Sequence, residues 1–316
     1  MTAGPPASLR RSPAVYFTSD YGTADEFVGV VHAVLHRFAP GVPVVDLSHE
    51  VPAFDVAAGA DLLVRCTPVL GPGVVLAVVD PEVGTDRRAV AVGVEPARGD
   101  PRERPGWLVG PDNGLLVPLA GALGGARRAF AVDRAAASAR GWPAVAGSWT
   151  FDGRDLLGPA AAHLVMGGSP ELLGPELDPG TLTPPPHRLS PRSGEGEEGE
   201  VLLALVRGTD RFGNVQLDLG VDDLERAASR SAPELEVAFE IELVPDDRGG
   251  LDRVQAGATT RRARQVRAYA LLDPGELGVL VDAVGRAALV CDRASAADLL
   301  GRPQAGDRVR LRLVAG

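Results

Sequence analysis

The sequence predicts an N-terminal α/β domain with a mainly parallel sheet, followed by a small antiparallel β-barrel-like domain. Apolar, β-branched runs alternate with helical segments through the first half of the chain. Short strand-like segments separated by turns fill the last third. A stretch rich in Pro and Gly, with an acidic end, lies between them at 178–199. We therefore divide the chain into a disordered leader (1–12), an N-terminal domain (13–180), a linker (181–199) and a C-terminal β domain (200–316).

In the N-terminal half, hydrophobic patterning separates strands from helices. Strands are predicted at Ala14–Ser19, Val42–Leu47, Val74–Val79, Ala89–Val94 and Arg128–Asp133. One helix is predicted to begin at a cap formed by Thr23 or Asp25 and to end at Phe38. Further helices are predicted over Val56–Val64 and over 156–168, and glycines end the last of them.

In the last third, the strand-like segments are short and bounded by turn residues. They are Val201–Val206, Glu236–Leu243, Gln265–Ala270, Gly278–Val281, Ala287–Cys291 and Arg308–Val314, with one helix at Ala294–Leu300. This spacing is typical of a small barrel.

Net charge excludes several classes of partner. The chain of 316 residues has a formal charge of −10, so no basic excess is present to neutralise phosphates. We expect neither nucleic-acid nor membrane binding. All 32 basic residues are Arg, which excludes lysine Schiff-base chemistry.

Cysteine usage and the absence of targeting signals favour a cytoplasmic protein. Cys66 and Cys291 lie in apolar patterns and read as buried, reduced side chains. No apolar run reaches the ~18 residues of a membrane helix. No Cys/His set has metal-ligand spacing, so the sequence predicts no metal site.

The stretch Val74–Arg88 carries the most informative chemistry. An apolar run ends at Asp80. Pro81 follows and interrupts the strand, and a pair of arginines that begins with Arg87 comes after a turn. Its carboxylate would lie at the carboxyl end of a buried strand, where open α/β sheets bind ligands. The alternative is an ordinary turn with a capping Asp and solvated arginines.

Established catalytic motifs are missing. The sequence has no Walker A loop, no Rossmann glycine fingerprint, no nucleophile elbow and no HExxH helix. Acidic and small polar groups instead recur where elements end, with Asp20 and Asp80 as the first examples. Each alone reads as a cap or turn, and together they indicate a site.

Six ordered segments resemble one known family. They are Ser19–Gly29, Val45–Asp55, Val78–Arg88, Gly110–Gly114, Thr150–Asp155 and Asp210–Asn214. This set resembles the S-adenosyl-L-methionine (SAM) hydrolases (adenosine-forming), also called SAM hydroxide adenosyltransferases, which are related to the fluorinase and chlorinase. The resemblance runs in order from about residue 14 to 314.

The resemblance implies a reaction and an assembly. Water or hydroxide would displace methionine from ribose C5′ of SAM, which is the substrate, and no cofactor would be needed. Subunits would form a homotrimer, with each site between the N-terminal domain of one subunit and the C-terminal domain of its neighbour.

The resemblance also assigns catalytic roles. Asp80 would orient or deprotonate the water, and Arg87 would hold that carboxylate and the incoming oxygen. Asp152 stands where the hydrolases usually have His in TFHGRD. It would serve as a second base with Arg87 between two acids, weaken the relay, or merely cap the following helix.

Binding roles follow from the same motifs. Asp20 would take the ribose hydroxyls, and Asp25 and Asp210 the methionine ammonium. Phe54 would line the ribose and nucleophile pocket, while Thr150 and Phe151 would lie along the C5′ face. Asn214 would pair with an adenine edge, and Phe212 would either pack on the base or fill the β-domain core.

Two other functions stay open on the sequence. A halogenase using chloride would share the fold, but the halogenating relatives carry an uncharged residue at the Asp80 position. A SAM- or adenosine-binding protein without catalysis is favoured by Asp152 and by Asp282–Gly285, where the family's Asn-Ser-x-Gly serine is replaced by Ala283.

Overall fold

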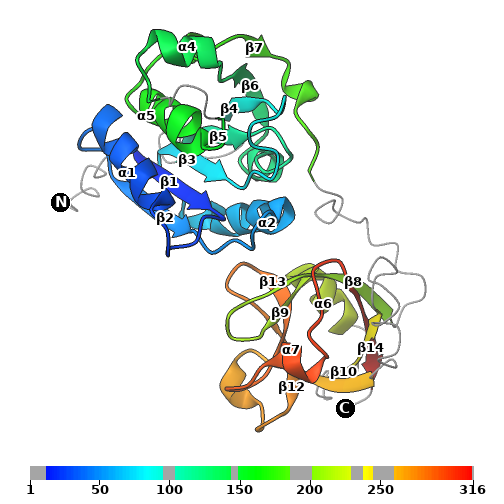
Figure 1. The fold of residues 1–316 in the computed structure, drawn as a ribbon. Coiled ribbons are helices and arrows are strands. Elements are labelled where there is room, and N and C mark those ends of the chain that lie inside the picture. The colour runs from blue at the N-terminus through cyan, green and yellow to red at the C-terminus, as the bar shows by residue number, and fades with distance from the viewer. Residues whose placement is uncertain are drawn as a thin grey trace, which may run out of the picture. The chain divides into compact units, whose positions relative to one another are not determined.

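The structure is a computed structural model that describes residues 12–94, 104–143, 149–185, 201–228, 238–244 and 260–314. The chain divides into two compact units, Met1–Leu189 and Ser190–Gly316, each with its own sheet and hydrophobic core (Figure 1). Nearly all of the predicted leader, and the predicted linker from residue 186 onward, lie outside the described residues. Within the described parts of the chain, no helix is long and apolar enough to span a membrane.

The N-terminal unit contains a seven-stranded sheet of order β2-β1-β3-β5-β4-β6-β7. Its strands are β1 (Ala14–Ser19), β2 (Val44–Ser48), β3 (Gly73–Val78), β4 (Ala89–Val94), β5 (Pro105–Pro111), β6 (Ala126–Ala131) and β7 (Glu176–Leu177). Neighbours from β2 to β5 are parallel, and only β4 and β7 run against the other strands. The predicted mainly parallel sheet is confirmed.

Helices cover both faces of this sheet (Figure 1). They are α1 (Phe27–Phe38), α2 (Val56–Cys66), α3 (Val117–Ala122), α4 (Arg134–Ala139) and α5 (Gly158–Val165). Because strand side chains alternate between faces, Val74, Leu76 and Val78 of β3 pack in the core with α1 and α5. Val75 and Ala77 pack in the core with α2 and α3. The uninterrupted apolar run of β3 therefore reflects burial on both faces.

The strand order fixes where the topology of the sheet switches. The chain passes from β1 to β2 on one side and returns to β3 on the other, so the topology switches between β1 and β3. Ligands bind at such switch points, outside the carboxyl ends of the strands. Ser19 pairs with Val78 across these two strands, and the Asp20 N–H donates to Val78 O at 3.3 Å. Asp20 and Asp80 thus leave neighbouring strand ends, as predicted.

The C-terminal unit is a closed barrel of order β10-β11-β12-β13-β9-β8-β14. Its elements are β8 (Val201–Thr209), β9 (Val215–Gly220), α6 (Val221–Ala228), β10 (Ala238–Val244), β11 (Thr260–Gln265), β12 (Leu277–Val281), β13 (Arg286–Val290), α7 (Ala296–Leu299) and β14 (Arg308–Val314). Its neighbouring strands are antiparallel except β11 and β12. The prediction of a small antiparallel barrel is confirmed.

Two local predictions were wrong, and two elements of the C-terminal unit were missed. Helix α1 starts after Glu26 without a side-chain cap, and Thr23 donates instead to Glu50 at 3.1 Å. The predicted strand Gln265–Ala270 is displaced, because β11 ends at Gln265 and a 3₁₀ turn follows at Tyr269–Leu271. The sequence TRRARQ of β11 is strongly charged, so its strand character comes from pairing with β10 and β12. Strand β9 and helix α6 were not predicted.

Gly73 offers a stability test of this sheet. Its φ is +134°, and a Cβ there would lie 1.9 Å from the carbonyl oxygen of Ala14 in β1. We expect Gly73→Ala to lower the free energy of unfolding of this unit by at least about 1–3 kcal/mol, because backbone strain adds to the clash. Gly121→Ala is the control, since nothing lies within 4 Å of a Cβ at that position. Urea titration by tryptophan fluorescence reports on this unit, since all three tryptophans lie in it; equal stability of the two variants would contradict the prediction.

Candidate active site

The turn between β3 and β4 folds Arg87 back onto Asp80. The Glu82 N–H donates to Asp80 Oδ1 at 3.3 Å, and the Thr85 hydroxyl donates to Glu82 O at 2.7 Å. The Arg87 N–H then donates to Thr85 Oγ1 at 3.2 Å. Gly84 adopts φ +83°, and a Cβ there would lie 2.9 Å from the carbonyl oxygen of Trp149. The turn is therefore held by its own small and polar residues, and the alternative of solvated arginines is excluded for Arg87.

Arg87 bridges two buried carboxylates. Its Nε donates to Asp80 Oδ1 at 3.1 Å, and its Nη2 donates both to Asp80 Oδ2 and, at 2.8 Å, to Asp152 Oδ2. The side chains of Arg87 and Asp80 are each 4% exposed, and that of Asp152 is 6% exposed. Arg87 Nη1 is buried and has no hydrogen-bond partner. One strong donor is therefore buried without an acceptor, which is a costly state for a charged group.

Asp152 is held by a second arginine that the sequence did not indicate. Its Oδ1 accepts a hydrogen bond from Arg134 Nη2, and the Arg134 guanidinium lies 4.5 Å from the centre of the Trp149 ring. Asp152 precedes the π-helical turn Gly153–Leu157 but makes no capping hydrogen bond. The interpretation of Asp152 as a helix cap is therefore wrong. Each of its carboxylate oxygens accepts from a guanidinium group.

An aromatic group lies beside the carboxylates. Tyr21 contacts Phe151 edge-on at 5.7 Å between ring centres, and Phe27 contacts Phe151 at 5.2 Å. A Cβ at Gly153 would lie 2.4 Å from the Tyr21 hydroxyl, so only glycine permits this approach. The glycine of TFDGRD thus marks a close contact rather than a positive φ. Tyr21 was not among the predicted site residues.

Burial dominates the electrostatics of the site. Burial raises the pKa of Tyr21 far above its usual value, and the nearby carboxylates of Asp20, Asp80 and Asp152 raise it further. Burial also raises the pKa of Asp80, opposed by Arg87 and reinforced by Asp152. Tyr21 therefore keeps its proton and offers a neutral hydroxyl next to the acids.

The segment after β2 contributes a strained residue. Phe54 has φ +65°, a conformation that bulky L-residues rarely adopt, and it is 70% exposed. Its N–H donates to Asp20 Oδ2 at 2.9 Å, which fixes the Asp20 carboxylate. Asp25 and Thr150 are both exposed. This hydrogen bond brings the predicted site residues Phe54 and Asp20 together.

A cavity of about 340 Å³ opens next to the paired charges. Its lining includes Arg87, Arg134, Trp149 and Asp152. Arg88, the other arginine of the turn, also borders this cavity, but its guanidinium pairs with Asp112. The two adjacent arginines therefore have different roles. Arg87 belongs to the charge cluster, and Arg88 holds the loop after β5.

In the C-terminal unit, Asp210 organises the loop between β8 and β9. Its Oδ1 accepts from the backbone N–H groups of Phe212 and Asn214 at 2.9 and 3.0 Å, and its Oδ2 accepts from Asn214 Nδ2 at 2.8 Å. Asn214 is 6% exposed, whereas Phe212 is 73% exposed. Of the two roles considered for Phe212, core filling is therefore excluded.

This loop borders a second cavity of about 610 Å³. Phe212, Asn214, Tyr269, Cys291 and the segment 292–295 line it. Among these residues the sequence had indicated only Phe212 and Asn214. Tyr269 and the cysteine come from segments predicted only as parts of strands.

The hairpin between β12 and β13 carries the altered family motif. Asp282 Oδ1 accepts from the backbone N–H groups of Val284 and Arg286, each at 2.9 Å. Burial raises the pKa of Tyr269, and the charges of Asp210 and Asp282 raise it further. The loop after β8, the 3₁₀ turn and this hairpin therefore gather at one end of the barrel.

Comparison with known proteins shows the family of this chain. Residues 15–174 match the SAM hydroxide adenosyltransferase N-terminal domain. The chain is 40% identical over 301 residues to the (R)-S-adenosyl-L-methionine hydrolase of Salinispora tropica, covering 95% of this chain and 98% of that protein. The chain belongs to the SAM hydroxide adenosyltransferase family. The predicted family resemblance is confirmed.

More distant relatives include a protein named fluorinase. A fluorinase of Actinopolyspora mzabensis is 28% identical over 259 residues, covering 74% of this chain and 82% of that protein. A crystal structure of an uncharacterized conserved protein from Thermotoga maritima matches with a TM-score of 0.75 and 26% identity, covering 94% of this chain and 99% of that chain. The curated hydrolase is thus nearer in sequence than this fluorinase.

The contact between Arg134 and Asp152 can be tested by a double-mutant cycle. We expect Arg134→Ala and Asp152→Asn to be non-additive by about 0.5–3 kcal/mol in free energy of unfolding, because each removes the partner of a buried charge. Urea titration with tryptophan fluorescence gives the coupling. The control pairs Arg134→Ala with Asp112→Asn, which belongs to the separate Arg88 pair and should add within about 0.5 kcal/mol. Additivity of the Arg134–Asp152 cycle would contradict the arrangement described here.

Proposed function

We propose that this protein hydrolyses SAM to adenosine and L-methionine, by attack of water on ribose C5′. The observation that carries the proposal is the buried Asp80–Arg87 pair at the carboxyl end of β3, with Arg87 Nη1 left without a partner. The curated relative with 40% identity is named for the same hydrolysis. The assignment as a hydrolase is therefore supported by both the site and the family.

The reaction needs few groups. A C–O bond forms at C5′ while the C5′–S bond breaks, and the bonding pair stays on sulfur. Methionine leaves as a neutral thioether from a sulfonium, so neither a general acid nor an added cofactor is required. The site has to place one water behind C5′ and exclude its competitors.

Asp80 and Arg87 are proposed to handle this water. Asp80 accepts the water proton as the C–O bond forms, and its raised pKa brings its basicity closer to neutral pH. Arg87 Nη1 is the buried donor available to hold the water oxygen. Arg87 also fixes the Asp80 carboxylate through two hydrogen bonds.

Asp152 is proposed to hold Arg87 in place. One of its oxygens accepts from Arg87 and the other from Arg134, so both are engaged by cations. Arg134 supplies the positive charge that compensates the second buried carboxylate of this cluster. This geometry favours a positioning role for Asp152 over the predicted service as a second base.

In the N-terminal unit, the predicted binding residues are proposed to hold the ribose and the reacting carbon. Asp20 takes the ribose hydroxyls, and its fixed carboxylate supports this role. Phe54 lines the ribose pocket, while Thr150 and Phe151 lie along the C5′ face. Asp25 is proposed to take the methionine ammonium, consistent with its exposure.

In the C-terminal unit, the 610 Å³ cavity is the proposed adenine site. Phe212 presents an exposed ring for stacking, and Asn214 offers an amide edge at the same cavity. Asp210 is proposed to contact the methionine ammonium in addition to holding its own loop. The altered segment Asp282–Gly285 leaves the methionine carboxylate to backbone donors, because the family serine is absent.

We further propose a cytoplasmic homotrimer. The division of the candidate binding residues between the two units supports this proposal, as does the family resemblance, which implies sites between subunits. The cytoplasmic assignment is supported by the two free cysteines, whose thiols both have pKa values raised by burial.

Two alternatives lead to different products. A halogenase would need to admit an anion beside the Asp80 carboxylate, which repels it. In a binding protein without catalysis, the buried pair of Asp80 and Arg87 would have no function. Incubation of purified protein with SAM, followed by chromatographic separation, distinguishes them.

We expect adenosine and methionine as products. Asp80→Asn should lower kcat by about 10²–10⁴-fold, the typical contribution of a general base. Asp86→Asn, an exposed residue of the same turn, is the matched control and should retain kcat. Formation of 5′-chloro-5′-deoxyadenosine would establish the halogenase, and binding of SAM without turnover would establish the binding protein.

The pH dependence of kcat provides a second test. Asp80 acts as a base only when ionised, so kcat falls as pH falls through its pKa. Because burial raises that pKa, we expect the acidic limb above the value of about 3.9 for an ordinary Asp. Asp152→Asn removes a charge that raises it, so this limb should move to lower pH. An acidic limb at or below pH 4, or a shift to higher pH, would contradict the proposed role.

A further inference from the structure

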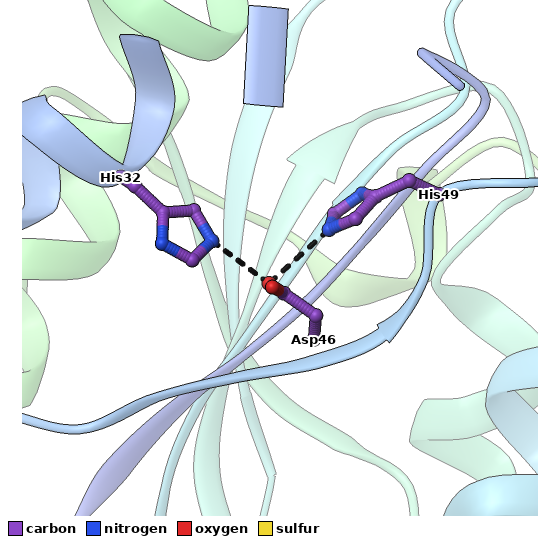
Figure 2. A group of neighbouring side chains, drawn as sticks. All are labelled: His32, Asp46 and His49. Atoms are coloured by element: carbon purple, nitrogen blue, oxygen red, sulfur yellow. Dashed lines mark hydrogen bonds and ion pairs between the residues drawn. The ribbon is translucent and has the colours of Figure 1, made fainter. Parts of the chain in front are cut away.

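A second group of titratable side chains lies outside the catalytic cluster. His32 on α1, Asp46 on β2 and His49 just after β2 point toward one another (Figure 2). His32 Nε2 lies 2.9 Å from Asp46 Oδ1, and His49 Nε2 lies 3.1 Å from the same oxygen. The three ligand-type atoms all lie within 4.8 Å of one another.

The orientation of His49 is fixed from behind. Its Nδ1 is 2.8 Å from the hydroxyl of Ser19, which is fully buried. Its Nε2 is buried and makes no hydrogen bond of acceptable geometry, despite its short distance to Asp46 Oδ1. A buried imidazole nitrogen thus points at the group without a hydrogen bond of its own. Metal-bound histidines characteristically use their second nitrogen in this way, hydrogen-bonded to a neighbouring group.

The surroundings combine an apolar base with an open side. The Phe17 ring lies 4.5 Å from the His49 ring and 6.1 Å from the His32 ring, measured between centres. The side chain of His49 is 5% exposed, whereas those of His32 and Asp46 are 36% and 42% exposed. An ion can therefore enter past His32 and Asp46 and meet the fixed His49.

We propose that His32, Asp46 and His49 form a binding site for a divalent transition-metal ion, with Zn²⁺ as the best match. Two imidazole nitrogens and one carboxylate oxygen form the donor set of zinc sites with three protein ligands, whereas Mg²⁺ and Ca²⁺ prefer oxygen alone. The ion takes the place of the direct nitrogen–oxygen contacts, and water fills the remaining position. This site departs from the expectation that the sequence holds no metal site. That expectation rested on Cys/His spacing alone.

A hydrolytic triad is the competing interpretation of the same residues. Ser19, His49 and Asp46 form a connected hydroxyl–imidazole–carboxylate series. Ser19 is fully buried, so its oxygen is out of reach of any substrate. The series therefore serves to orient His49.

The site is joined to the substrate loop of the N-terminal unit. Ser19 directly precedes Asp20, and the Tyr21 N–H donates to Ser19 Oγ at 3.3 Å. The Gly22 N–H donates to His49 O at 2.7 Å. A metal ion that fixes His49 also fixes the backbone that carries Asp20, so its role is structural and not part of the bond exchange at C5′.

The test is Zn²⁺ titration of full-length protein freed of metal by a chelator, followed by calorimetry and thermal unfolding. We expect binding of one Zn²⁺ per chain and a rise in Tm. His32→Gln should weaken binding more than the roughly 10–100-fold loss typical of outer-shell changes. His36→Gln, an exposed histidine one turn further along α1, should bind as the wild type does.

Two further measurements keep the test decisive. Asp46→Asn, at a half-exposed position, should also lose binding, and Co²⁺ in the wild type should give the intense visible bands of a four-coordinate site. Absence of Zn²⁺ binding by the folded wild type would overturn the proposal. Equal binding by the wild type and His32→Gln would overturn it as well. None of these readouts depends on SAM turnover.

Discussion

The site depends on four charged groups that compensate one another away from water. Asp80, Arg87, Asp152 and Arg134 alternate in sign along one connected series of hydrogen bonds. Buried charges are tolerated only when they are paired and hydrogen-bonded, and removing one partner leaves a strongly destabilising charge. Asp152 stands where the family resemblance implies a histidine, and Arg134 compensates its charge. The series leaves Arg87 Nη1 as its one unpartnered buried atom, and the proposed chemistry is placed at this donor.

The sheet explains why the series lies where it does. Because the topology switches between β1 and β3, Asp20 and Asp80 leave adjacent strand ends. The turn after β3 returns Arg87 to Asp80 through hydrogen bonds of its own side chains. Phe54, whose N–H fixes Asp20, adopts a strained backbone conformation. Such strain is typical of functional segments, which the surrounding structure must hold.

The features that the sequence revealed are those whose physical cause is local. Apolar runs and turn residues located β1, β4 and β14 to the residue. The pairing of Asp80 with Arg87, two residues of one turn, was implied by the family resemblance. The missed features depend on distant partners. Arg134 lies on α4 and contacts Asp152 from there, and no short-range sequence pattern predicts that contact. Tyr21 is likewise defined by burial against a later segment. The His32–Asp46–His49 group escaped a search for Cys/His spacing because its ligands come from a helix, a strand and the loop that follows.

The reaction proposed for this protein is attack of water on ribose C5′ with release of methionine. Turnover of SAM in water enriched in ¹⁸O, followed by mass spectrometry of both products, tests it most directly. The account predicts one ¹⁸O atom in the 5′-hydroxyl of adenosine and none in methionine, because the C5′–S bond is the one that breaks. Adenosine without the label, or formation of 5′-methylthioadenosine with a labelled amino acid, would place the attack elsewhere and contradict the account.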